Sequence, residues 1–413
     1  MFIDEKNYFG KYTAEDLAKE YGTPLYVYNE NVLRESMRDV SKIITSYPYR
    51  ANFSMKANSN PEILKLVLDE GLNADAMSDN EIRILQYAGF PSDRIFFVPN
   101  NVSIDEIKFA VDNNIIVSLD SLDQLDLYGS YFPNTKCAVR INPGTGAGHH
   151  DKVVTAGKNT KFAIQESEID GIFEIAEKYN LRICGINQHV GSLFMDPAPF
   201  LKATENLLRI AKKFKDLDFI DFGGGFGIPY RKLDGENRFD FDAFRDGFEK
   251  LISDFVKEYG KTPLFKTEPG RYCVAEGGVL LGRVHAVKNN SGKTYAGTDI
   301  GMNVLMRPVL YDSYHEVLVY RDGKYVEPSA NDKEITVTGN ICETGDIIAK
   351  ERVLPEMQRG DLICVMDAGA YGYSMASNYN ARLRPAEVLI TKDGEARLIR
   401  RREKFTDLFN LFI

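Results

Sequence analysis

Lys56 is the residue of this chain best placed for covalent chemistry. It stands in Phe53-Ser-Met-Lys56-Ala-Asn58, at the end of an apolar, strand-like run, and a helical pattern begins at Pro61. A lysine at this point would direct its amine out of the end of a sheet, where it could form a Schiff base with a carbonyl compound. Taken alone, the pattern is more typical of a lysine that ends a strand at the surface. Residues further along the chain decide between the two interpretations.

The segments around Lys56 predict the scaffold that would hold it. From about residue 50 to 270, apolar runs alternate with segments whose apolar residues recur three and four positions apart, as in 81–88 and 200–214. The eight apolar runs are residues 51–55, 72–77, 94–98, 115–119, 136–141, 181–189, 219–222 and 263–267. Eight alternations favour a closed parallel (β/α)8 TIM barrel over an open sheet. A helix over residues 29–46 is expected to precede it.

The second part of the chain has a different texture. After Arg271, short strand-like runs are separated by turn sequences such as Arg-Asp-Gly-Lys and Lys-Asp-Gly-Glu. The runs are residues 279–287, 293–297, 317–320, 334–337, 361–366 and 387–390. This pattern predicts a mostly antiparallel C-terminal β domain. We expect the barrel to span residues 28–275 and the β domain to span residues 276–413.

Polar or glycine-rich clusters follow six of the eight barrel runs, at the strand ends where such barrels carry their chemistry. They are Lys56, Ser78 with Glu81, Asn142, His189 with Gly191-Ser192, Gly223-Gly224-Gly225, and Glu268-Pro-Gly-Arg271. The three glycines would let the backbone approach a phosphate, although a plain turn is the alternative. Glu268 would hold a pyridine nitrogen protonated or form a surface salt bridge. His189 would stack on a flat ring or fill the core.

The β half offers further candidates. Cys342 lies beside Glu343 next to a turn, so we expect it to be exposed, whereas the apolar runs around Cys137, Cys184 and Cys364 predict buried thiols. Arg307 and Tyr311, and Tyr371 in Asp367-Ala-Gly-Ala-Tyr371, stand in turn-like settings able to bind a carboxylate or a phosphate. Surface turns without a ligand are the alternative.

Composition limits the class of protein. The chain has 413 residues and a net charge of −9, which argues against nucleic acid or an anionic membrane as the main partner. Its start resembles no signal peptide, it has no apolar run of about 18 residues, and its five scattered cysteines are typical of free thiols, so we expect a cytoplasmic protein. The long polar connection 142–162 predicts a mobile lid. Its adjacent His149 and His150 do not indicate a metal site.

Taken together and in this order, the motifs resemble those of the fold-type III pyridoxal-phosphate decarboxylases. The resemblance runs along nearly the whole chain and implies an alanine-racemase-like barrel with a β domain that residues 1–27 also join. The segments that carry it are Lys56-Ala-Asn58, Arg140-Ile-Asn-Pro-Gly144, His189-Val-Gly-Ser192, Asp221-Phe-Gly-Gly-Gly225, Glu268-Pro-Gly-Arg271, Cys342-Glu343-Thr-Gly-Asp346 and Asp367-Ala-Gly-Ala-Tyr371.

The resemblance also implies the roles of the site residues. The cofactor would be pyridoxal 5′-phosphate, joined covalently to Lys56, with His189 stacked on its ring and Glu268 on the pyridine nitrogen. The phosphate would be bound by Ser192, Gly223, Gly224, Gly225 and Tyr371. The far end of the substrate would be bound by Arg271, Arg307, Tyr311, Glu343 and Tyr371. Cys342 would enter from the second subunit of a homodimer and reprotonate the substrate after CO2 is lost.

A cationic clamp and an ammonium acceptor fit a substrate with two amines and two carboxylates. The resemblance therefore implies that meso-2,6-diaminopimelate is decarboxylated to L-lysine, the last step of lysine biosynthesis. The alternatives are a sister decarboxylase for D-lysine, D-ornithine, carboxynorspermidine or a carrier-bound amino acid, a racemase, and a non-catalytic cofactor-binding protein. The sequence departs from the commoner pattern at Asp79-Asn80, Asn187-Gln188, Leu193 and Thr344. These departures bear on the substrate rather than on the cofactor chemistry.

Overall fold

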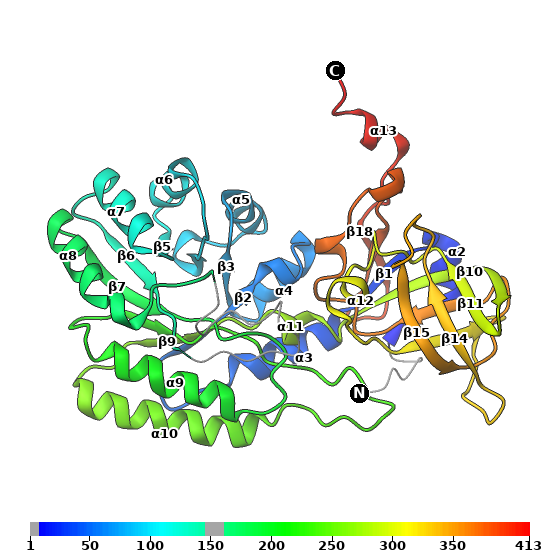
Figure 1. The fold of residues 1–413 in the computed structure, drawn as a ribbon, viewed down its shortest axis with the longest axis horizontal. Helices are drawn as coiled ribbons and strands as arrows, with labels where there is room; N and C mark the ends of the chain where they lie inside the picture. Colours follow the sequence, from blue (N-terminus) through cyan, green and yellow to red (C-terminus); the bar gives the residue numbers. More distant parts are fainter. Residues whose placement is uncertain (1–7, 145–160) are drawn as a thin grey trace. The chain divides into compact units, whose positions relative to one another are not determined.

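The computed structural model describes residues 8–144 and 161–413, which divide into two compact units. The barrel unit comprises Ser36–Ile228 and Arg238–Cys273. The β unit comprises the described residues up to Glu35, the short segment Pro229–Asn237, and Val274–Ile413. Figure 1 labels many of the elements of both units. Most of the predicted lid 142–162, including His149 and His150, lies outside the described residues.

Eight parallel strands close the barrel in sequence order, and the last pairs with the first. The strands are β2 (Tyr49–Ser54), β3 (Asn73–Ala76), β4 (Ile95–Phe97), β5 (Ile116–Leu119), β6 (Lys136–Arg140), β7 (Arg182–Asn187), β8 (Phe219–Asp221) and β9 (Leu264–Thr267). The helices around them are α3 (Glu30–Ser41), α4 (Pro61–Asp69), α5 (Asp79–Tyr87), α6 (Ile104–Asp112), α7 (Leu122–Tyr131), α8 (Ile169–Tyr179), α9 (Ala198–Ala211), α10 (Phe241–Tyr259) and α11 (Arg271–Val274).

Side-chain caps begin four consecutive helices of the barrel. The cap residues of α4, α5, α6 and α7 are Asn60, Ser78, Ser103 and Ser121. Each side chain accepts a hydrogen bond from a backbone N–H of the first helical turn, which contributes about 1 kcal/mol to helix stability. The caps fix where each helix starts after its strand, and so they fix the loops that form the rim of the barrel.

The β unit is built on one large mixed sheet. Its strands are β1 (Leu25–Asn29), β10 (Gly278–Asn290), β11 (Lys293–Thr298), β12 (Val317–Arg321), β13 (Lys324–Tyr325), β14 (Lys333–Thr338), β15 (Ile347–Leu354), β16 (Leu362–Val365), β17 (Ala386–Ile390) and β18 (Ala396–Arg400). Most pairs are antiparallel, whereas β1 with β17 and β11 with β14 are parallel. The short helices are α2 (Ala14–Tyr21), α12 (Arg307–Tyr311) and α13 (Phe405–Phe409).

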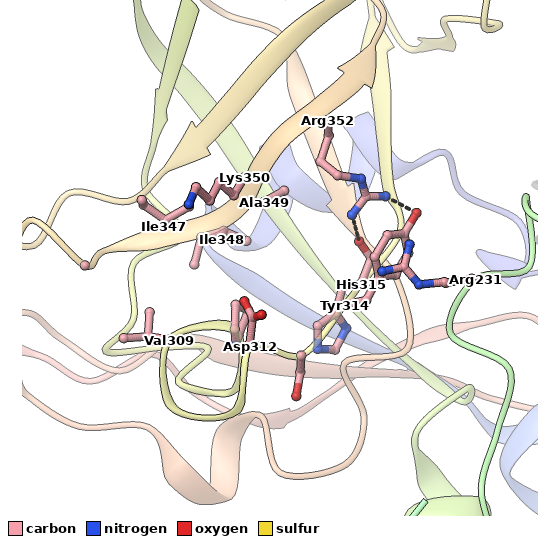
Figure 2. Close-up of a pocket in the computed structure, with 13 residues that line it drawn as sticks. Arg231, Val309, Asp312, Tyr314, His315, Ile347, Ile348, Ala349, Lys350 and Arg352 are labelled. Carbon is pink, nitrogen blue, oxygen red and sulfur yellow. Dashed lines mark hydrogen bonds between the residues drawn. The ribbon is translucent and has the colours of Figure 1, made fainter. Parts of the chain in front are cut away.

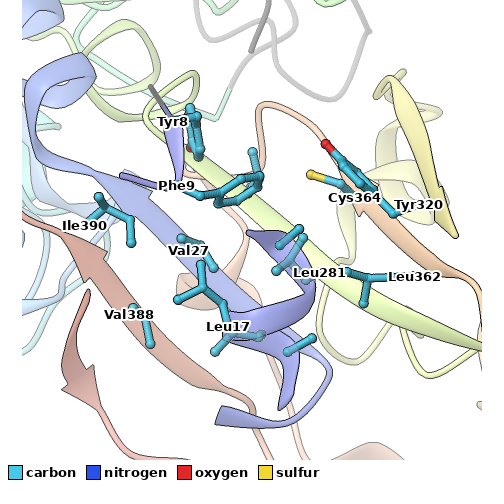
Figure 3. Close-up of a cluster of buried hydrophobic side chains, with 14 of the residues drawn as sticks. Tyr8, Phe9, Leu17, Val27, Leu281, Tyr320, Leu362, Cys364, Val388 and Ile390 are labelled. Carbon is cyan, nitrogen blue, oxygen red and sulfur yellow. The ribbon is translucent and has the colours of Figure 1, made fainter. Parts of the chain in front are cut away.

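Both ends of the chain contribute to the core of the β unit. In Figure 3, Leu17 and Val27 from the N-terminal part lie against Leu281 of β10 and Val388 of β17. All four side chains are fully buried. Burying an aliphatic side chain of this size contributes about 1.5–3 kcal/mol relative to leaving it exposed. The N-terminal segment therefore folds as part of the β unit because its apolar residues complete that core.

The fold class expected from the sequence is confirmed. All eight barrel strands lie within two residues of the predicted runs, and the predicted helix before them is α3, which ends at Ser41. The six predicted runs of the β domain are β10, β11, β12, β14, β16 and β17, and the sequence did not predict β1, β13, β15 or β18. Among the described residues, no helix is long and apolar enough to cross a membrane.

Candidate active site

Lys56 lies where the first barrel strand ends. A single 3-10 turn, η1 (Met55–Ala57), begins directly after β2, and a backbone bond from Asn58 to the Met55 carbonyl closes it. Met55 and Ala57 are buried, whereas Lys56 is exposed. Because its two neighbours are anchored in the core, the turn directs the lysine away from it. This is the position predicted from the sequence.

A row of polar side chains runs across four neighbouring strands at the same end of the barrel. Arg140, Asn187, Asp221 and Lys266 occupy adjacent register positions on β6, β7, β8 and β9. Side chains in register on neighbouring parallel strands point to the same face. From β2, the Asn52 side chain donates a hydrogen bond to the Asp221 carboxylate at 3.1 Å. The inside of the barrel is therefore polar at the carboxyl ends of its strands.

Three buried carboxyl groups lie in this polar end. Burial raises the pKa of Asp75 to about 7, and it raises the pKa of Asp221 to about 6. The pKa of Glu268 is raised well above its ordinary value by burial and by the charges of the other two carboxylates. The positive charge of Lys56 lowers this pKa, but by less. Ser54 donates a hydrogen bond to Asp75 at 2.7 Å. Mutual repulsion and burial make this end of the barrel receptive to a cation.

The three-glycine loop is packed between two strand ends. A Cβ at Gly224 would lie 1.8 Å from the carbonyl oxygen of Glu268, and a Cβ at Gly223 would lie 2.3 Å from that of Gln188. Gly223 also has a φ of +73°, and its N–H donates to Asp221 Oδ1 at 3.0 Å. No side chain fits at these positions, so the backbone itself forms the surface of the loop. A loop without Cβ atoms leaves room for an anion to approach its backbone closely.

His189 is held on one side of the same loop. Its Nδ1 accepts a hydrogen bond from the Gly224 N–H at 3.3 Å. Burial lowers the pKa of His189 well below its ordinary value, and the charges of Lys56 and Arg140 lower it further. The ring is therefore neutral, with its proton on Nε2. A neutral, flat ring of this kind can pack against another flat ring without adding charge.

Arg271 and Ser192 lie on the same rim. Arg271 is buried at the start of α11 and donates from Nη2 to Ser192 Oγ at 3.0 Å. Leu193, the next residue, has a φ of +65°, which is unusual for a branched apolar side chain. The loop after β7 therefore has a strained residue directly after its contact with Arg271.

The residues of the barrel unit fit the cofactor that the motifs imply. Pyridoxal 5′-phosphate needs an amine for its aldehyde, N–H groups for its phosphate, and a carboxylate for its ring nitrogen. Lys56 supplies the first. The loop Gly223–Gly225 supplies the second through the N–H of its half-buried Gly225, because the N–H groups of Gly223 and Gly224 are bonded to Asp221 and His189. Glu268 Oε1 is buried and, within residues 8–144 and 161–413, it has no hydrogen-bond partner. A buried carboxylate oxygen without a donor is costly, and a cationic N–H would satisfy it.

The β unit carries Cys342 and Glu343 on an exposed loop. Both side chains are exposed, whereas Cys137, Cys184, Cys273 and Cys364 are buried, and all five are free thiols. The inner side of the loop is held by the Asp346 carboxylate, which accepts from the N–H groups of Met302 at 2.6 Å and Ile341 at 2.7 Å. The predicted exposure of Cys342 is confirmed.

Arg307 is fixed by its neighbours in the β unit. It is fully buried, and its Nη1 lies 2.9 Å from His315 Nε2. Its guanidinium carbon lies 4.9 Å from the centre of the Tyr230 ring. His315 Nδ1 lies 2.7 Å from the Met366 carbonyl oxygen, which can only accept, so Nδ1 carries the proton. Nε2 is thereby free to accept from Arg307. Tyr311, at the end of the same helix, is half-buried.

A cavity of about 370 Å³ adjoins this segment, lined by Val309, Asp312, Tyr314, Arg231 and Arg352 among others (Figure 2). The Tyr314 ring packs against two guanidinium groups, with the Arg231 carbon 3.9 Å and the Arg352 carbon 3.6 Å from its centre. Arg352 also donates to the His315 carbonyl at 3.2 Å. These contacts hold the segment that carries the partner of Arg307.

The turn that carries Tyr371 is anchored by a buried ion cluster. Lys232 contacts Asp367 at 2.5 Å and Glu276 at 3.1 Å, and all three side chains are at most 7% exposed. Burial raises the pKa of Asp367 to about 6, against the field of Lys232. Asp367 and Tyr371 both have a positive φ, at 55° and 56°. The cluster therefore holds the turn in a conformation that its residues rarely adopt.

The structure brings one set of the candidates together. Lys56, His189, Ser192, Gly223–Gly225, Glu268 and Arg271 all lie in the barrel unit at the carboxyl ends of its strands, and Arg307, Tyr311, Cys342, Glu343 and Tyr371 lie in the β unit. Asn52, Asp75 and Lys266 also lie in the polar end of the barrel, and they were not predicted as site residues. Each is a polar residue inside an apolar strand run, which was the available signal. Among the described residues, no group of three or more His, Cys, Asp or Glu side chains could hold a metal ion.

The chain is similar in sequence and in structure to known pyridoxal-dependent decarboxylases. The family described as pyridoxal-dependent decarboxylase, pyridoxal binding domain, matches residues 31–275. The diaminopimelate decarboxylase of Methanothermobacter thermautotrophicus is 40% identical over 96% of this chain and 92% of its own, and that of Escherichia coli K12 is 33% identical over 97% and 96%. The crystal structure of the Helicobacter pylori diaminopimelate decarboxylase complexed with L-lysine is similar with a TM-score of 0.87, at 31% identity over 96% of this chain and 98% of its own.

Proposed function

Because the chain belongs to the diaminopimelate decarboxylase family of pyridoxal-dependent decarboxylases, we propose that its site residues act as follows. The protein is a carboxy-lyase that uses pyridoxal 5′-phosphate to convert meso-2,6-diaminopimelate into L-lysine and CO2. The observation that supports the assignment of its site most directly is the buried Glu268 Oε1 atom, which has no hydrogen-bond partner among the described residues. It lies at the end of the barrel that carries Lys56 and the glycine loop.

In the barrel unit, each residue contributes one property to the reaction. When bound, pyridoxal 5′-phosphate supplies an electron sink for the charge that remains on the substrate α carbon as CO2 leaves. Lys56 would hold the cofactor covalently through its amine. Glu268 accepts the ring N–H and becomes ionised, because an opposite charge favours the carboxylate form. His189 would pack on the ring as a neutral imidazole, so it would place no second positive charge beside the protonated ring. Ser192 and the loop Gly223–Gly225 bind the phosphate, together with Tyr371 from the β unit.

The β unit supplies the residues for the rest of the substrate. Arg307 and Tyr311, with Arg271, bind the distal carboxylate, Glu343 binds the distal ammonium, and Tyr371 contributes to substrate binding as well as to phosphate binding. The two substrate ends need opposite charges from the protein, and this set supplies both. Cys342 Sγ donates a proton to the α carbon after CO2 has left. We propose that Cys342 and Glu343 serve the site of the partner subunit in a cytoplasmic homodimer.

The first test concerns the cofactor and the substrate. Borohydride should fix pyridoxal phosphate on the peptide that contains Lys56, and CO2 release across a panel of amino acids should be fastest with meso-diaminopimelate. Recovery of the cofactor on another lysine would disprove the role of Lys56. A preference for a substrate without a distal carboxylate would return the assignment to a sister decarboxylase.

The second test concerns the shared site. Lys56→Ala and Cys342→Ala proteins should each be nearly inactive. After subunit exchange, the mixture should regain part of the activity, because some heterodimers contain one intact site. An inactive mixture in which exchange has been demonstrated by mass spectrometry would mean that the two residues do not act across subunits.

A further inference from the structure

A second segment of the β unit holds the Cys342–Glu343 loop from the outside. The Cys342 N–H donates to Asn380 Oδ1 at 2.7 Å, and the Tyr379 hydroxyl donates to Glu343 Oε1. Arg382 donates from Nη2 to the Asn340 carbonyl at 3.0 Å. Three side chains within four residues thus reach three different residues of one loop. No motif of the sequence analysis included them.

The segment adopts a strained conformation. Asn380 has φ 55° and ψ 27°, and Ala381 has a φ of 56°, so two consecutive residues are left-handed. Asparagine tolerates this conformation, whereas alanine is strained in it. Asn380 and Ala381 are both exposed, so the strain does not serve the packing of a core. It does aim the Asn380 side chain at the backbone of Cys342.

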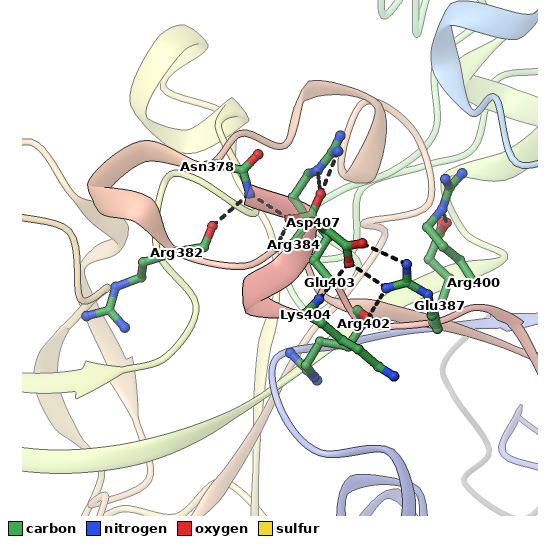
Figure 4. Close-up of polar contacts among 10 residues, drawn as sticks. Asn378, Arg382, Arg384, Glu387, Arg400, Arg402, Glu403, Lys404 and Asp407 are labelled. Carbon is green, nitrogen blue, oxygen red and sulfur yellow. Dashed lines mark hydrogen bonds and ion pairs between the residues drawn. The ribbon is translucent and has the colours of Figure 1, made fainter. Parts of the chain in front are cut away.

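The other side of this turn is fixed to the end of the sheet. Asn378 donates to the Arg382 carbonyl at 2.9 Å, which closes the turn, and to Glu403 Oε2 at 2.6 Å. Glu403 also accepts from the Arg384 backbone N–H at 2.8 Å and from its side chain at 2.6 Å (Figure 4). A rigid anchor is what a short surface turn needs if it is to hold another loop.

We propose that Tyr379 and Asn380 are positioning residues for the Cys342–Glu343 loop, an inference that rests on the function proposed above. Asn380 sets the backbone of Cys342 and thereby the position of the thiol that donates a proton. Tyr379 engages one oxygen of Glu343, which orients the carboxylate and leaves its second oxygen for the distal ammonium of the substrate. The two residues therefore act on different steps, one on proton delivery and the other on substrate binding.

The experiment uses the holoenzyme and variants that separate these roles. Tyr379→Phe removes only the hydroxyl, and Tyr87→Phe is a matched control at an exposed tyrosine of α5. Asn380→Gly tolerates the left-handed conformation but loses the acceptor, whereas Asn380→Asp keeps both. The measurements are kcat and KM with meso-diaminopimelate, and the rate at which iodoacetamide alkylates the protein. Cys342 is the exposed one among the five cysteines, so this rate reports on its loop.

Each variant has a distinct expected result. Tyr379→Phe should raise KM roughly 3–10-fold with little change in kcat, the effect of one lost hydrogen bond to a charged group at the surface. Asn380→Gly should lower kcat roughly 3–10-fold and change the alkylation rate, because the thiol loses its fixed position. Asn380→Asp should turn over closer to wild type, yet react more slowly with iodoacetamide, because a nearby carboxylate disfavours the reactive thiolate.

The outcomes distinguish the positioning role from the proposed function. If Tyr379→Phe behaves as Tyr87→Phe does, and Asn380→Gly matches wild type in kcat and alkylation, the proposal is wrong. If wild type does not act on meso-diaminopimelate but Asn380→Gly still changes the alkylation rate, the loop contact stands and the assigned function fails. If Asn380→Gly and Asn380→Asp lose kcat equally, the acceptor atom is not what positions the thiol.

Discussion

Replacing Asp75 by asparagine should make the cofactor-free enzyme more stable and the holoenzyme less active. Asp75 is 1% exposed at the end of the barrel, and one of its oxygens, Oδ1, has no hydrogen-bond partner within the described ranges 8–144 and 161–413. The other accepts from Ser54 at 2.7 Å. The carbonyl oxygen of an asparagine would still accept the hydrogen bond from Ser54. Its NH2 group would carry no negative charge, so it would not repel Asp221 and Glu268.

The size and sign of the effect follow from the pKa of Asp75. Burial raises it from an ordinary value of 3.8 to about 7. Between about pH 4 and 7 the folded protein keeps a proton that the unfolded chain has lost, so the free energy of unfolding falls as pH rises. A pKa raised by about three units lowers the free energy of unfolding by about 4 kcal/mol above pH 7. Because Asp75, Asp221 and Glu268 titrate together, the part that belongs to Asp75 is about 2–4 kcal/mol. Asp75→Asn removes this penalty.

The measurement is urea unfolding of the cofactor-free proteins at about pH 5, 7 and 8.5. The advantage of Asp75→Asn over wild type should be small at the lowest pH and should grow toward the highest. Asp254→Asn, at an exposed position of α10, is the control and should show no such trend. An advantage that is constant with pH, or a loss of stability at about pH 8.5, would refute the electrostatic reasoning. kcat/KM should fall, because Asp75→Asn removes a negative charge that interacts electrostatically with Lys56.

Three further predictions concern the glycine loop, the substrate clamp and the buried ion cluster. Gly224→Ala should weaken pyridoxal phosphate binding at least about tenfold in an absorbance titration, because its Cβ would lie 1.8 Å from a backbone oxygen, whereas Gly297→Ala, with nothing closer than 3.7 Å, should not. Arg307→Ala should reduce kcat/KM for meso-diaminopimelate by roughly two to four orders of magnitude and much less for lysine, which has no distal carboxylate. Lys232→Met should lower the free energy of unfolding by about 3–5 kcal/mol in urea, and the loss should shrink as pH falls, because Asp367, whose pKa is raised by burial, then becomes protonated and no longer needs the lysine.

The sequence predicted the barrel well because its strands are buried on both faces and appear as short continuous apolar runs. The β unit was harder. β1 is apolar, but its partners Leu281 and Ala386 are hundreds of residues away, and no local pattern encodes such pairing. β15 carries Lys350, Glu351 and Arg352 in its middle, which interrupts the apolar pattern, and its pairing with β14 is irregular.

Site residues that belong to a local sequence motif could be predicted, whereas residues whose role depends on contacts with distant segments could not. Lys56 and the glycine loop could be predicted, because each is a local motif at a strand end. Asp75 could not, because its role depends on the register that sets Ser54 of β2 beside it. The same holds for Tyr379 and Asn380, which contact a loop almost forty residues earlier in the chain. Motifs record what a residue can do, and the fold decides which residues hold it in place.

Burying three carboxyl groups at one end of the barrel links cofactor binding to the stability of the protein. In the cofactor-free protein, the raised pKa values of Asp75, Asp221 and Glu268 mean that these groups lower the stability of the fold. Each carboxyl group is either kept protonated or carries a charge that is poorly solvated. A bound ring with a cationic N–H relieves part of that cost at Glu268, and so its binding free energy includes the relief. The cofactor should therefore stabilise the fold more at pH 8 than at pH 6, because at the lower pH more of the carboxyl groups are already neutral. The residues that destabilise the empty barrel are thus the ones that give it affinity for the cofactor.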